Sequence, residues 1–378
     1  MPFTIGVPRE AAPGETRVAL TPDAAGRLVK KGAEVAVERG AGESAFASDA
    51  AYEAAGCRLV DRAAALGADL VATVQGPVGD DVQAIRRGAV VVGLLRPLDD
   101  PALAGQLAAR GVTAIAMELV PRSTRAQRMD ALSAMSTVSG YKAAVLAADL
   151  LPVFFPLLTT AAGTVRPARV LVLGAGVAGL QALATARRLG AITAGYDVRP
   201  AAREQVESVG ARFVVLDLDT AGSEDAGGYA KALAADEQAR QVELLAAHVA
   251  TYDAVITTAL IPGRPAPRLI TQAGVEGMKP GSVIIDLAAS NGGNCEATKP
   301  GDVVVHAGVR IAGPLNLPAQ MPVHASQLYS GTVVAMIEEF FKDDAFAVDM
   351  ADDILVNAVV AHEGAVVNER VRSLLAPA

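Results

Sequence analysis

The pattern of hydrophobic and polar positions alternates between two periods along the first 130 residues. Short apolar runs typical of buried strands lie at 4–8, 33–38, 68–74, 89–95 and 112–120. Between several of them, apolar residues recur every three or four positions, which predicts helices at 21–32, 48–56 and 99–111. This alternation predicts βαβ units and therefore a mostly parallel sheet.

A continuous helical pattern runs from Ala131 to about Leu151, where Pro152 and Pro156 end or kink it. A second strand–helix series begins at Arg169, with strands expected at 169–173, 192–198, 212–216, 253–260, 282–288 and 303–309. The helical stretch that follows, 326–344, is expected to return to the first domain. We therefore predict an α/β chain with two Rossmann-like domains, parallel sheets and a cleft between them. The first is 1–137 plus 321–378, and the second is 138–320.

Composition supports two large cores and argues against several function classes. Of the 378 residues, 52% are apolar and 20% charged, and the net charge of −8 comes without the basic cluster that nucleic-acid binding needs. Two distant cysteines and four scattered histidines argue against a disulfide framework or a metal site. The N-terminus lacks the apolar segment of a signal peptide, and the charge-free run 150–165 is shorter than the roughly 20 residues of a membrane-spanning helix. We therefore expect a cytoplasmic protein.

A glycine-rich turn carries the strongest chemical signal. Gly174, Gly176 and Gly179 fit the G-x-G-x-x-G pattern, with an apolar strand before them and an amphipathic helix after them. In this motif the glycines allow a tight turn, the approach of a pyrophosphate and close helix–strand packing. Asp197 ends the next strand, where an acid accepts hydrogen bonds from ribose hydroxyls and repels a 2′-phosphate. This favours NAD(H) over NADP(H), although Arg199 leaves the choice open. A glycine turn without a ligand is the simpler interpretation, but it explains neither the helix nor the acid.

The chain resembles the alanine dehydrogenase and nicotinamide nucleotide transhydrogenase superfamily. The resemblance covers nearly the whole chain and rests on the glycine fingerprint with GVPRE, ETRVALTP, GYDVRPAAREQVESVGARFV and DLAASNGGNCE. The transhydrogenase branch, and within it the separate NAD(H)-binding component, is indicated by RAQRMDALS, GGYAKAL, TTALIPGRPAP and LNLPAQMPVHASQLYS. The resemblance implies hydride transfer between NAD(H) bound here and NADP(H) on a partner subunit. It also implies a homodimer and a membrane proton-channel subunit as a further partner, which would hold the chain peripherally at the inner membrane.

The substrate residues of alanine dehydrogenase are largely replaced. Arg17 matches the carboxylate-binding arginine of that enzyme, but Gln75 stands at the lysine position, Arg96 at the catalytic histidine and Ser290 at an aspartate. Glutamine lacks the lysine charge, and arginine is a poor general acid–base group. Direct transfer between two nicotinamide rings requires no such group. An alanine dehydrogenase-like amino-acid dehydrogenase and a non-catalytic nucleotide-binding regulatory module remain as alternatives.

The polar stretch PRSTRAQRMDALS follows a predicted core strand, at the strand end where α/β folds bind ligands. By resemblance, four of its residues match the family's loop beside the nicotinamide and are the catalytic candidates: Arg122, Gln127, Asp130 and Ser133. A carboxamide needs a donor and an acceptor, which Gln127 with Asp130 or Ser133 can offer. Arg122 could pair with Asp130 or lie beside the pyrophosphate. Without the resemblance, a helix start with local ion pairs explains the stretch equally well.

The predicted nucleotide contacts lie on segments that follow strands: Gly174, Ala175, Gly176, Val177, Gly179, Asp197, Val198, Arg199, Gly228, Tyr229, Thr258, Ala259 and Leu260. By resemblance, 217–241 is the family's mobile loop, with Tyr229 as part of a lid; an ordinary polar connection is the alternative. Arg125 and Arg128 are expected to form local ion pairs with Asp130. Cys295 and His324 are expected to be structural.

Overall fold

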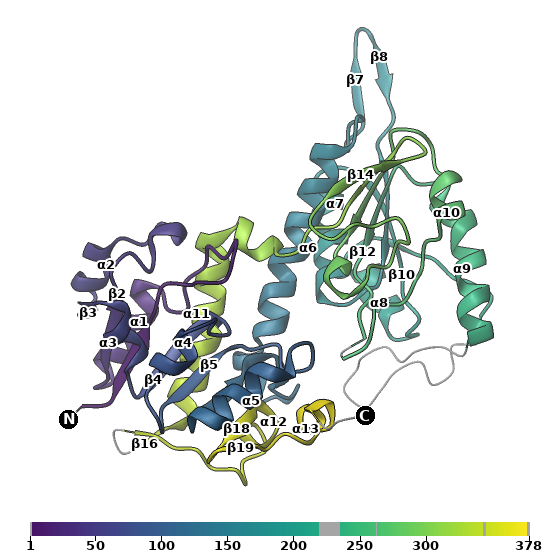
Figure 1. The fold of residues 1–378 in the computed structure, drawn as a ribbon. Helices are drawn as coiled ribbons and strands as arrows, with labels where there is room; N and C mark the ends of the chain where they lie inside the picture. The colour runs from purple at the N-terminus through teal and green to yellow at the C-terminus, as the bar shows by residue number, and fades with distance from the viewer. Residues whose placement is uncertain (1, 219–234, 262, 343–344, 376–378) are drawn as a thin grey trace. The chain divides into compact units, whose positions relative to one another are not determined.

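The chain folds into two compact α/β units (Figure 1). The computed structural model describes residues 2–218, 235–261, 263–342 and 345–375. The first unit comprises Met1–Met135 and Pro318–Ala378, and the second comprises Ser136–Leu317. Each contains a large, mostly parallel sheet, so the predicted fold class is confirmed.

The first unit is built on a sheet of eight strands in the order β19-β18-β6-β5-β4-β1-β2-β3. The six strands from β3 to β6 are parallel, and β18 and β19 add an antiparallel edge contributed by the C-terminal segment. Their bounds are β1 (Thr4–Val7), β2 (Glu34–Glu38), β3 (Arg58–Val60), β4 (Leu70–Gln75), β5 (Val90–Leu94), β6 (Thr113–Ala116), β18 (Val359–His362) and β19 (Ala365–Val366). The central strands are nearly continuous apolar runs because helices cover both faces.

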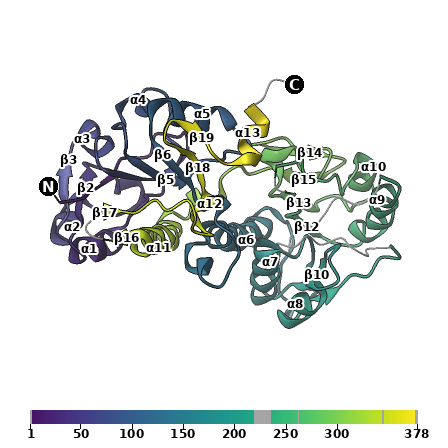
Figure 2. The same ribbon diagram turned by 90° about the horizontal axis from the view of Figure 1, so that it is seen from below.

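Helices cover the two faces of this sheet in separate groups (Figure 2). One group is α3 (Arg62–Leu66), α4 (Asp81–Ala84), α5 (Pro101–Arg110) and α13 (Glu369–Leu375). The other is α1 (Pro22–Lys30), α2 (Asp49–Ala54) and α11 (Pro322–Phe340). The buried Tyr329 hydroxyl of α11 donates to Thr73 O of β4 at 2.8 Å, which fixes this C-terminal helix on the N-terminal sheet.

The second unit is built on a sheet of seven strands in the order β11-β10-β9-β12-β13-β15-β14. Its strands are β9 (Arg169–Leu173), β10 (Ile192–Tyr196), β11 (Arg212–Phe213), β12 (Ala254–Thr257), β13 (Val283–Asp286), β14 (Val303–His306) and β15 (Val309–Ala312). All neighbours are parallel except β14 and β15. The single strand predicted at 303–309 was wrong: Ala307 and Gly308 both have positive φ (49° and 79°), which turns the chain into a hairpin.

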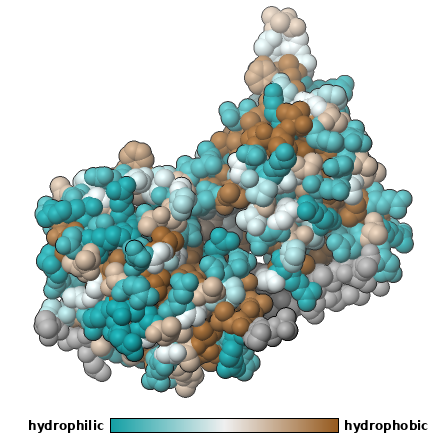
Figure 3. Space-filling view, viewed as in Figure 1, coloured by the Kyte–Doolittle hydropathy of each residue, from teal (hydrophilic) through white to brown (hydrophobic). Residues whose placement is uncertain are grey.

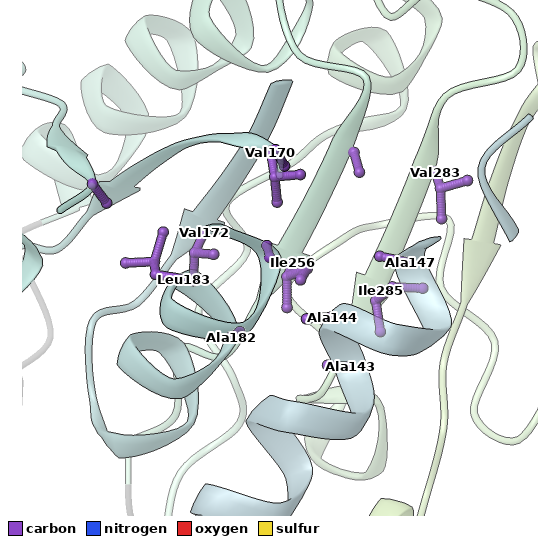
Figure 4. Packing of buried hydrophobic residues seen from close by; sticks show 14 of the residues in the cluster. Ala143, Ala144, Ala147, Val170, Val172, Ala182, Leu183, Ile256, Val283 and Ile285 are labelled. Carbon is purple, nitrogen blue, oxygen red and sulfur yellow. The ribbon is translucent and has the colours of Figure 1, made fainter. Parts of the chain in front are cut away.

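Two helical layers bury this second sheet. On one face lie α6 (Ala131–Leu150), α7 (Val177–Arg188) and α8 (Ala202–Ser208), and on the other α9 (Ala235–Val249) and α10 (Gln272–Glu276). Figure 4 shows Ala143, Ala144 and Ala147 of α6 facing Ile256 and Ile285 of the sheet. Small side chains on this part of α6 let the helix approach the strands closely.

Short elements complete the two units. They are the 3₁₀ turns η1 (Glu43–Ala45), η2 (Met117–Leu119), η3 (Ala126–Met129), η4 (Ala289–Asn291) and η5 (Leu317–Gln320), the helix α12 (Leu355–Ala358), and the strand pairs β7 (Leu158–Thr160) with β8 (Gly163–Val165) and β16 (Phe341–Lys342) with β17 (Ala345–Phe346). Within the described ranges, no helix combines the length and apolarity needed to cross a bilayer.

Two helical glycines give opposite expectations for substitution by alanine. A Cβ on Gly140 of α6 would lie 2.1 Å from Ala178 O, whereas a Cβ on Gly331 of α11 would meet no described atom within 4 Å. Gly140→Ala is expected to lower the free energy of unfolding by about 1–3 kcal/mol, because the helices must separate. Gly331→Ala is expected to leave it unchanged or raise it by up to about 1 kcal/mol, because alanine favours a helix. Urea denaturation of both variants checks this, and equal losses would contradict the close α6–α7 contact.

Candidate nucleotide-binding site

The three fingerprint glycines have three different structural roles. Gly174 has φ +97°, its N–H donates to Tyr196 O at 2.8 Å, and a Cβ there would lie 2.8 Å from Thr258 Oγ1. A Cβ on Gly179 would lie 1.9 Å from Gly174 O, so α7 rests directly on the turn. A Cβ on Gly176, by contrast, would meet no atom of the described residues within 4 Å. The turn thus packs tightly on the protein side and leaves open space at Gly176.

The open space at Gly176 adjoins the N-terminus of α7, where Gly176 is the N-cap residue and supplies no capping side chain. The first N–H groups of a helix and its dipole attract phosphate at such a position. The turn also lies at the topological switch point of the sheet, since β9 connects to β10 on one side and borders β12 on the other. The residues present therefore fit the pyrophosphate of a dinucleotide.

Asp197 and Arg199 form one hydrogen-bonded pair at the end of β10. Asp197 is largely buried, and its Oδ2 accepts from Ala175 N of the glycine turn at 2.7 Å and from Arg199 Nη2 at 2.8 Å. Its Oδ1 accepts from Arg199 N and Nε, both at 2.9 Å. Val198 between them packs against the core on the α9 face. A ribose would therefore meet an acid whose charge a neighbouring guanidinium offsets.

The segment after β12 is tied to the glycine turn and to a second loop. Thr258 Oγ1 donates to Gly174 O at 2.9 Å. Ala259 N donates to Asn294 Oδ1 at 3.0 Å, and Asn294 Nδ2 donates back to Ala259 O at 2.9 Å and to Pro267 O at 2.8 Å. Leu260 is 45% exposed and projects from this anchored backbone. Asn294, which is fully buried, holds the two loops together and was not among the predicted site residues.

Asp286, at the end of β13, is a second organising residue that sequence reasoning missed. Its carboxylate is fully buried and accepts four hydrogen bonds: from Thr257 Oγ1 (2.9 Å), Ala288 N (3.0 Å), Cys295 N (3.0 Å) and Thr298 Oγ1 (2.7 Å). A buried carboxylate with this many donors is well satisfied. It fixes the loop that carries Asn294. In the sequence, this role was indicated only by an acidic residue at the end of an otherwise apolar strand.

In the first unit, the polar stretch after β6 is anchored by apolar residues. Ala126 and Met129 of η3 are buried against the unit, while Arg122 and Gln127 are exposed. Asp130 precedes α6 and acts at its N-terminus, since its Oδ1 accepts from Ser133 N at 2.8 Å and its Oδ2 from Ser133 Oγ at 2.6 Å. The arrangement presents exposed polar side chains from a fixed turn.

The expected local pair between Arg125 and Asp130 was wrong. Arg125 Nη2 instead lies 2.5 Å from Asp352 Oδ1 and 2.7 Å from Asp353 Oδ1. Both aspartates belong to the C-terminal part of the unit. These contacts, which lie at the surface of the unit, link the polar stretch to the C-terminal segment of the chain.

Two predicted contacts, Gly228 and Tyr229, lie outside the described residues, as does most of the expected lid. Cys295 is fully buried, and burial raises the pKa of its thiol. In the part of the chain that the structure describes, no cluster of His, Cys, Asp and Glu could hold a metal ion.

Comparison with known protein families shows to which family the chain belongs. Residues 6–139 match the N-terminal domain, and residues 143–369 the C-terminal domain, of alanine dehydrogenase/PNT. The chain belongs to the alanine dehydrogenase/PNT family. This confirms the resemblance inferred from the sequence motifs.

Within this family, the chain is similar to transhydrogenase subunits. It is 45% identical to the NAD(P) transhydrogenase subunit alpha of Cereibacter sphaeroides, covering 96% of this chain and 70% of that protein. It is 42% identical to the NAD(P) transhydrogenase subunit alpha of Haemophilus influenzae, covering 95% and 71%. The transhydrogenase structure from Sinorhizobium meliloti superposes with a TM-score of 0.88 at 42% identity, over 96% of this chain and all of that one. These relatives support a component of an NAD(P) transhydrogenase, an oxidoreductase, and the family implies nicotinamide nucleotide binding.

The alanine dehydrogenase side of the family is also visible in the fold. An L-alanine dehydrogenase structure superposes with a TM-score of 0.83 at 25% identity, over 99% of each chain.

In the present chain Arg17 is buried, and its Nε donates to Glu15 Oε1 at 2.7 Å. Gln75 Nε2 donates to Glu15 Oε2 at 3.0 Å. Burial would raise the pKa of Glu15, but the bonds from Arg17 and Gln75 lower it to about 2. Glu15 is therefore ionised and forms a buried ion pair with Arg17.

Substitution of Gly176 should separate nucleotide binding from folding. Gly176 has φ −74°, so Gly176→Ala adds a methyl group without backbone strain, into the open space at the turn. We expect NADH to bind at least about tenfold more weakly, a cost of about 1.4 kcal/mol, with unfolding unchanged within about 0.5 kcal/mol. Calorimetric titration and thermal unfolding measure the two effects.

Gly179→Ala is the matched comparison, because its Cβ would overlap Gly174 O. It should lose stability as well as binding. Unchanged NADH affinity in a folded Gly176→Ala protein would show that no nucleotide approaches this turn.

Proposed function

We propose that the chain is the NAD(H)-binding subunit of a proton-translocating NAD(P) transhydrogenase, and that hydride passes directly between NAD(H) bound here and NADP(H) on a partner subunit. The observation that carries the proposal is the glycine turn, which is closed against the protein at Gly179 and open at Gly176, beside the N-terminus of α7. Relatives named as transhydrogenase alpha subunits, similar over at least 95% of this chain, support the choice of reaction.

Asp197 supports a preference for NAD(H). Its carboxylate lies at the end of β10, held by the glycine turn, and can accept from a ribose hydroxyl. Arg199 satisfies part of its hydrogen-bonding capacity but leaves the acid in place. A 2′-phosphate would have to displace or neutralise this acid, so NADH should bind more tightly than NADPH.

The polar stretch of the first unit has an orienting role in this proposal. The nicotinamide C4 gives or accepts the hydride, and no proton moves with it, so the residues need only hold the ring in place and exclude water. Gln127, Asp130 and Ser133 offer the donors and acceptors that a carboxamide needs, and Arg122 offers a cation for the pyrophosphate. Anchoring of η3 by Ala126 and Met129 supports such a role, because orientation requires a rigid support.

The environment of Arg17 supports the transhydrogenase over an amino-acid dehydrogenase. An amino-acid substrate needs a cation for its carboxylate and a group that moves a proton. Arg17 is already paired with Glu15, and Gln75 adds no charge. Arg96 is exposed and lies 3.4 Å from Asp99, where it cannot serve as a general base.

The assembly follows from the same proposal. The chain acts as a homodimer that is active only with its partners, the NADP(H)-binding subunit and a membrane proton-channel subunit. Through them it lies peripherally on the cytoplasmic side of the inner membrane. The two nucleotide couples have nearly equal potentials, so the proton gradient that supplies work acts through the partner subunits.

Hydride transfer in a reconstituted complex tests the proposal. The chain is mixed with the NADP(H)-binding subunit, and reduction of an NAD analogue by NADPH is followed by absorbance. Transfer is expected only when both proteins are present. A verified complex without transfer would indicate a regulatory nucleotide-binding module, and rapid turnover of pyruvate, ammonia and NADH by the chain alone would indicate a dehydrogenase.

Replacement of Gln127 tests the orienting role. Gln127→Asn shortens the side chain by one methylene, which should lower the hydride-transfer rate at least about tenfold because orientation is lost. NADH affinity should fall less than about threefold, since most contacts lie on the glycine turn. Arg128→Lys, an exposed neighbour in η3, should leave both unchanged. Equal losses of rate and affinity in Gln127→Asn would remove the orienting role.

A further inference from the structure

The carboxylate of Asp197 is fully hydrogen-bonded in this structure. A carboxylate has about four lone-pair positions, shared between its two oxygens. Among the described residues, four donors occupy them: Arg199 N and Nε on Oδ1, both at 2.9 Å, and Ala175 N and Arg199 Nη2 on Oδ2, at 2.7 and 2.8 Å. Asp197 can therefore accept from a ribose hydroxyl only after one of these donors has left.

Two of these donors are backbone N–H groups that the fold holds in place. Ala175 is buried within the glycine turn, which is anchored by the bond from Gly174 N to Tyr196 O at 2.8 Å. The bond from Arg199 N to Asp197 closes a two-residue turn, which aspartate commonly forms with the backbone. The guanidinium, by contrast, ends a flexible side chain that is 16% exposed. The guanidinium of Arg199 is therefore the donor that can leave.

The guanidinium occupies one position on each oxygen of the carboxylate. Its Nε contacts Oδ1 and its Nη2 contacts Oδ2 of Asp197, so its departure frees both oxygens for one donor each. The adenosine ribose of a dinucleotide carries neighbouring 2′ and 3′ hydroxyls, and an acid at the end of this strand is the group that accepts from them. The ribose and the guanidinium of Arg199 therefore require the same positions on the same carboxylate.

We infer that Arg199 is a specificity-determining residue that competes with the ribose of NAD(H) for Asp197 and, when displaced, is available to a 2′-phosphate. A guanidinium and a carboxylate form a strong, fork-shaped pair. Binding of NADH breaks this pair, which lowers the affinity, whereas NADPH supplies a new anion for the released guanidinium. Arg199 therefore narrows the preference for NADH that Asp197 creates.

This role deepens the proposed function, on which it rests, because a site that transfers hydride repeatedly must also release its nucleotide. Closure of the pair between Arg199 and Asp197 favours release, since it restores two hydrogen bonds to a carboxylate whose side chain is only 6% exposed. Product release limits the turnover of many enzymes. Arg199 should therefore speed the exchange of NAD(H) and weaken its binding.

Replacement of Arg199 by methionine tests the inference. Arg199→Met removes the guanidinium and keeps much of the apolar side chain. NADH should bind at least about threefold more tightly, because the ribose then displaces water and not a charged donor. NADPH should bind more weakly, because its 2′-phosphate loses a cation. The ratio of the two affinities should rise about tenfold, which calorimetric titration of the wild type and the variant measures.

Arg203→Met is the matched control, because it removes the same charge from the helix that follows. Arg203 lies on α8 with its side chain 56% exposed, and its Nε contacts Glu207 Oε1 at 3.3 Å. Figure 3 shows hydrophilic residues over much of the visible face of this unit, so the loss of one surface charge should leave folding unchanged. The affinities of Arg203→Met for NADH and NADPH should equal those of the wild type.

A second variant and a second ligand locate the effect at the ribose. Arg199→Lys keeps the charge but cannot contact both oxygens as a planar fork, so its NADH affinity should lie between those of the wild type and Arg199→Met. The gain in Arg199→Met should be smaller for the NADH analogue that contains 2′-deoxyadenosine, which has one hydroxyl fewer for Asp197.

Three results would overturn the inference alone, in a wild type that binds NADH. They are an Arg199→Met protein with unchanged affinities, one that loses NADH and NADPH affinity equally, and one that gains as much for the 2′-deoxy analogue as for NADH. Urea denaturation of each variant shows whether it is folded, and Arg199→Lys replaces Arg199→Met if the latter is not. A folded wild type that binds neither nucleotide would overturn the proposed function together with the inference.

Discussion

The contact between Gly174 and Gly179 is the constraint on which the second unit depends. The carbonyl oxygen of Gly174 occupies the place where a side chain at position 179 would begin, so α7 can rest on the turn only without a Cβ there. This contact sets where the helix starts and which way its first N–H groups point. The turn packs against the protein at Gly174 and Gly179, and the space beside Gly176 stays open.

Hydrogen bonds from buried polar residues extend this constraint across the edge of the sheet. Thr258 joins the segment after β12 to Gly174 O, Asn294 joins that segment to the loop after β13, and Asp286 fixes the loop itself. The strands below are apolar and specify no chemistry. The polar residues at the carboxyl ends of the strands form hydrogen bonds mainly with one another. Backbone groups and a few exposed side chains therefore remain available at this edge of the sheet.

Much of this arrangement could be predicted from local sequence. Strand–helix alternation predicted two α/β units, and the glycine spacing between a strand and a helix predicted the turn, because both signals depend on residues close together in the chain. Arg125 could not be assigned in this way, since its partners Asp352 and Asp353 come from the far end of the sequence. The roles of Asp286 and Asn294 depend equally on tertiary contacts. The β14–β15 turn was missed because Ala307 adopts positive φ, which alanine rarely does.

The return of the chain to its first unit has a consequence for the order of synthesis. β18 pairs with β6, and α11 covers β4 through Tyr329, yet both are translated after the whole of Ser136–Leu317. When the second unit has just been synthesised, the sheet of the first unit therefore still has one open edge, and the face that α1 and α2 cover still lacks α11. The second unit can fold while its end is still attached to the ribosome, but the first unit cannot be completed until Pro318–Ala378 has emerged.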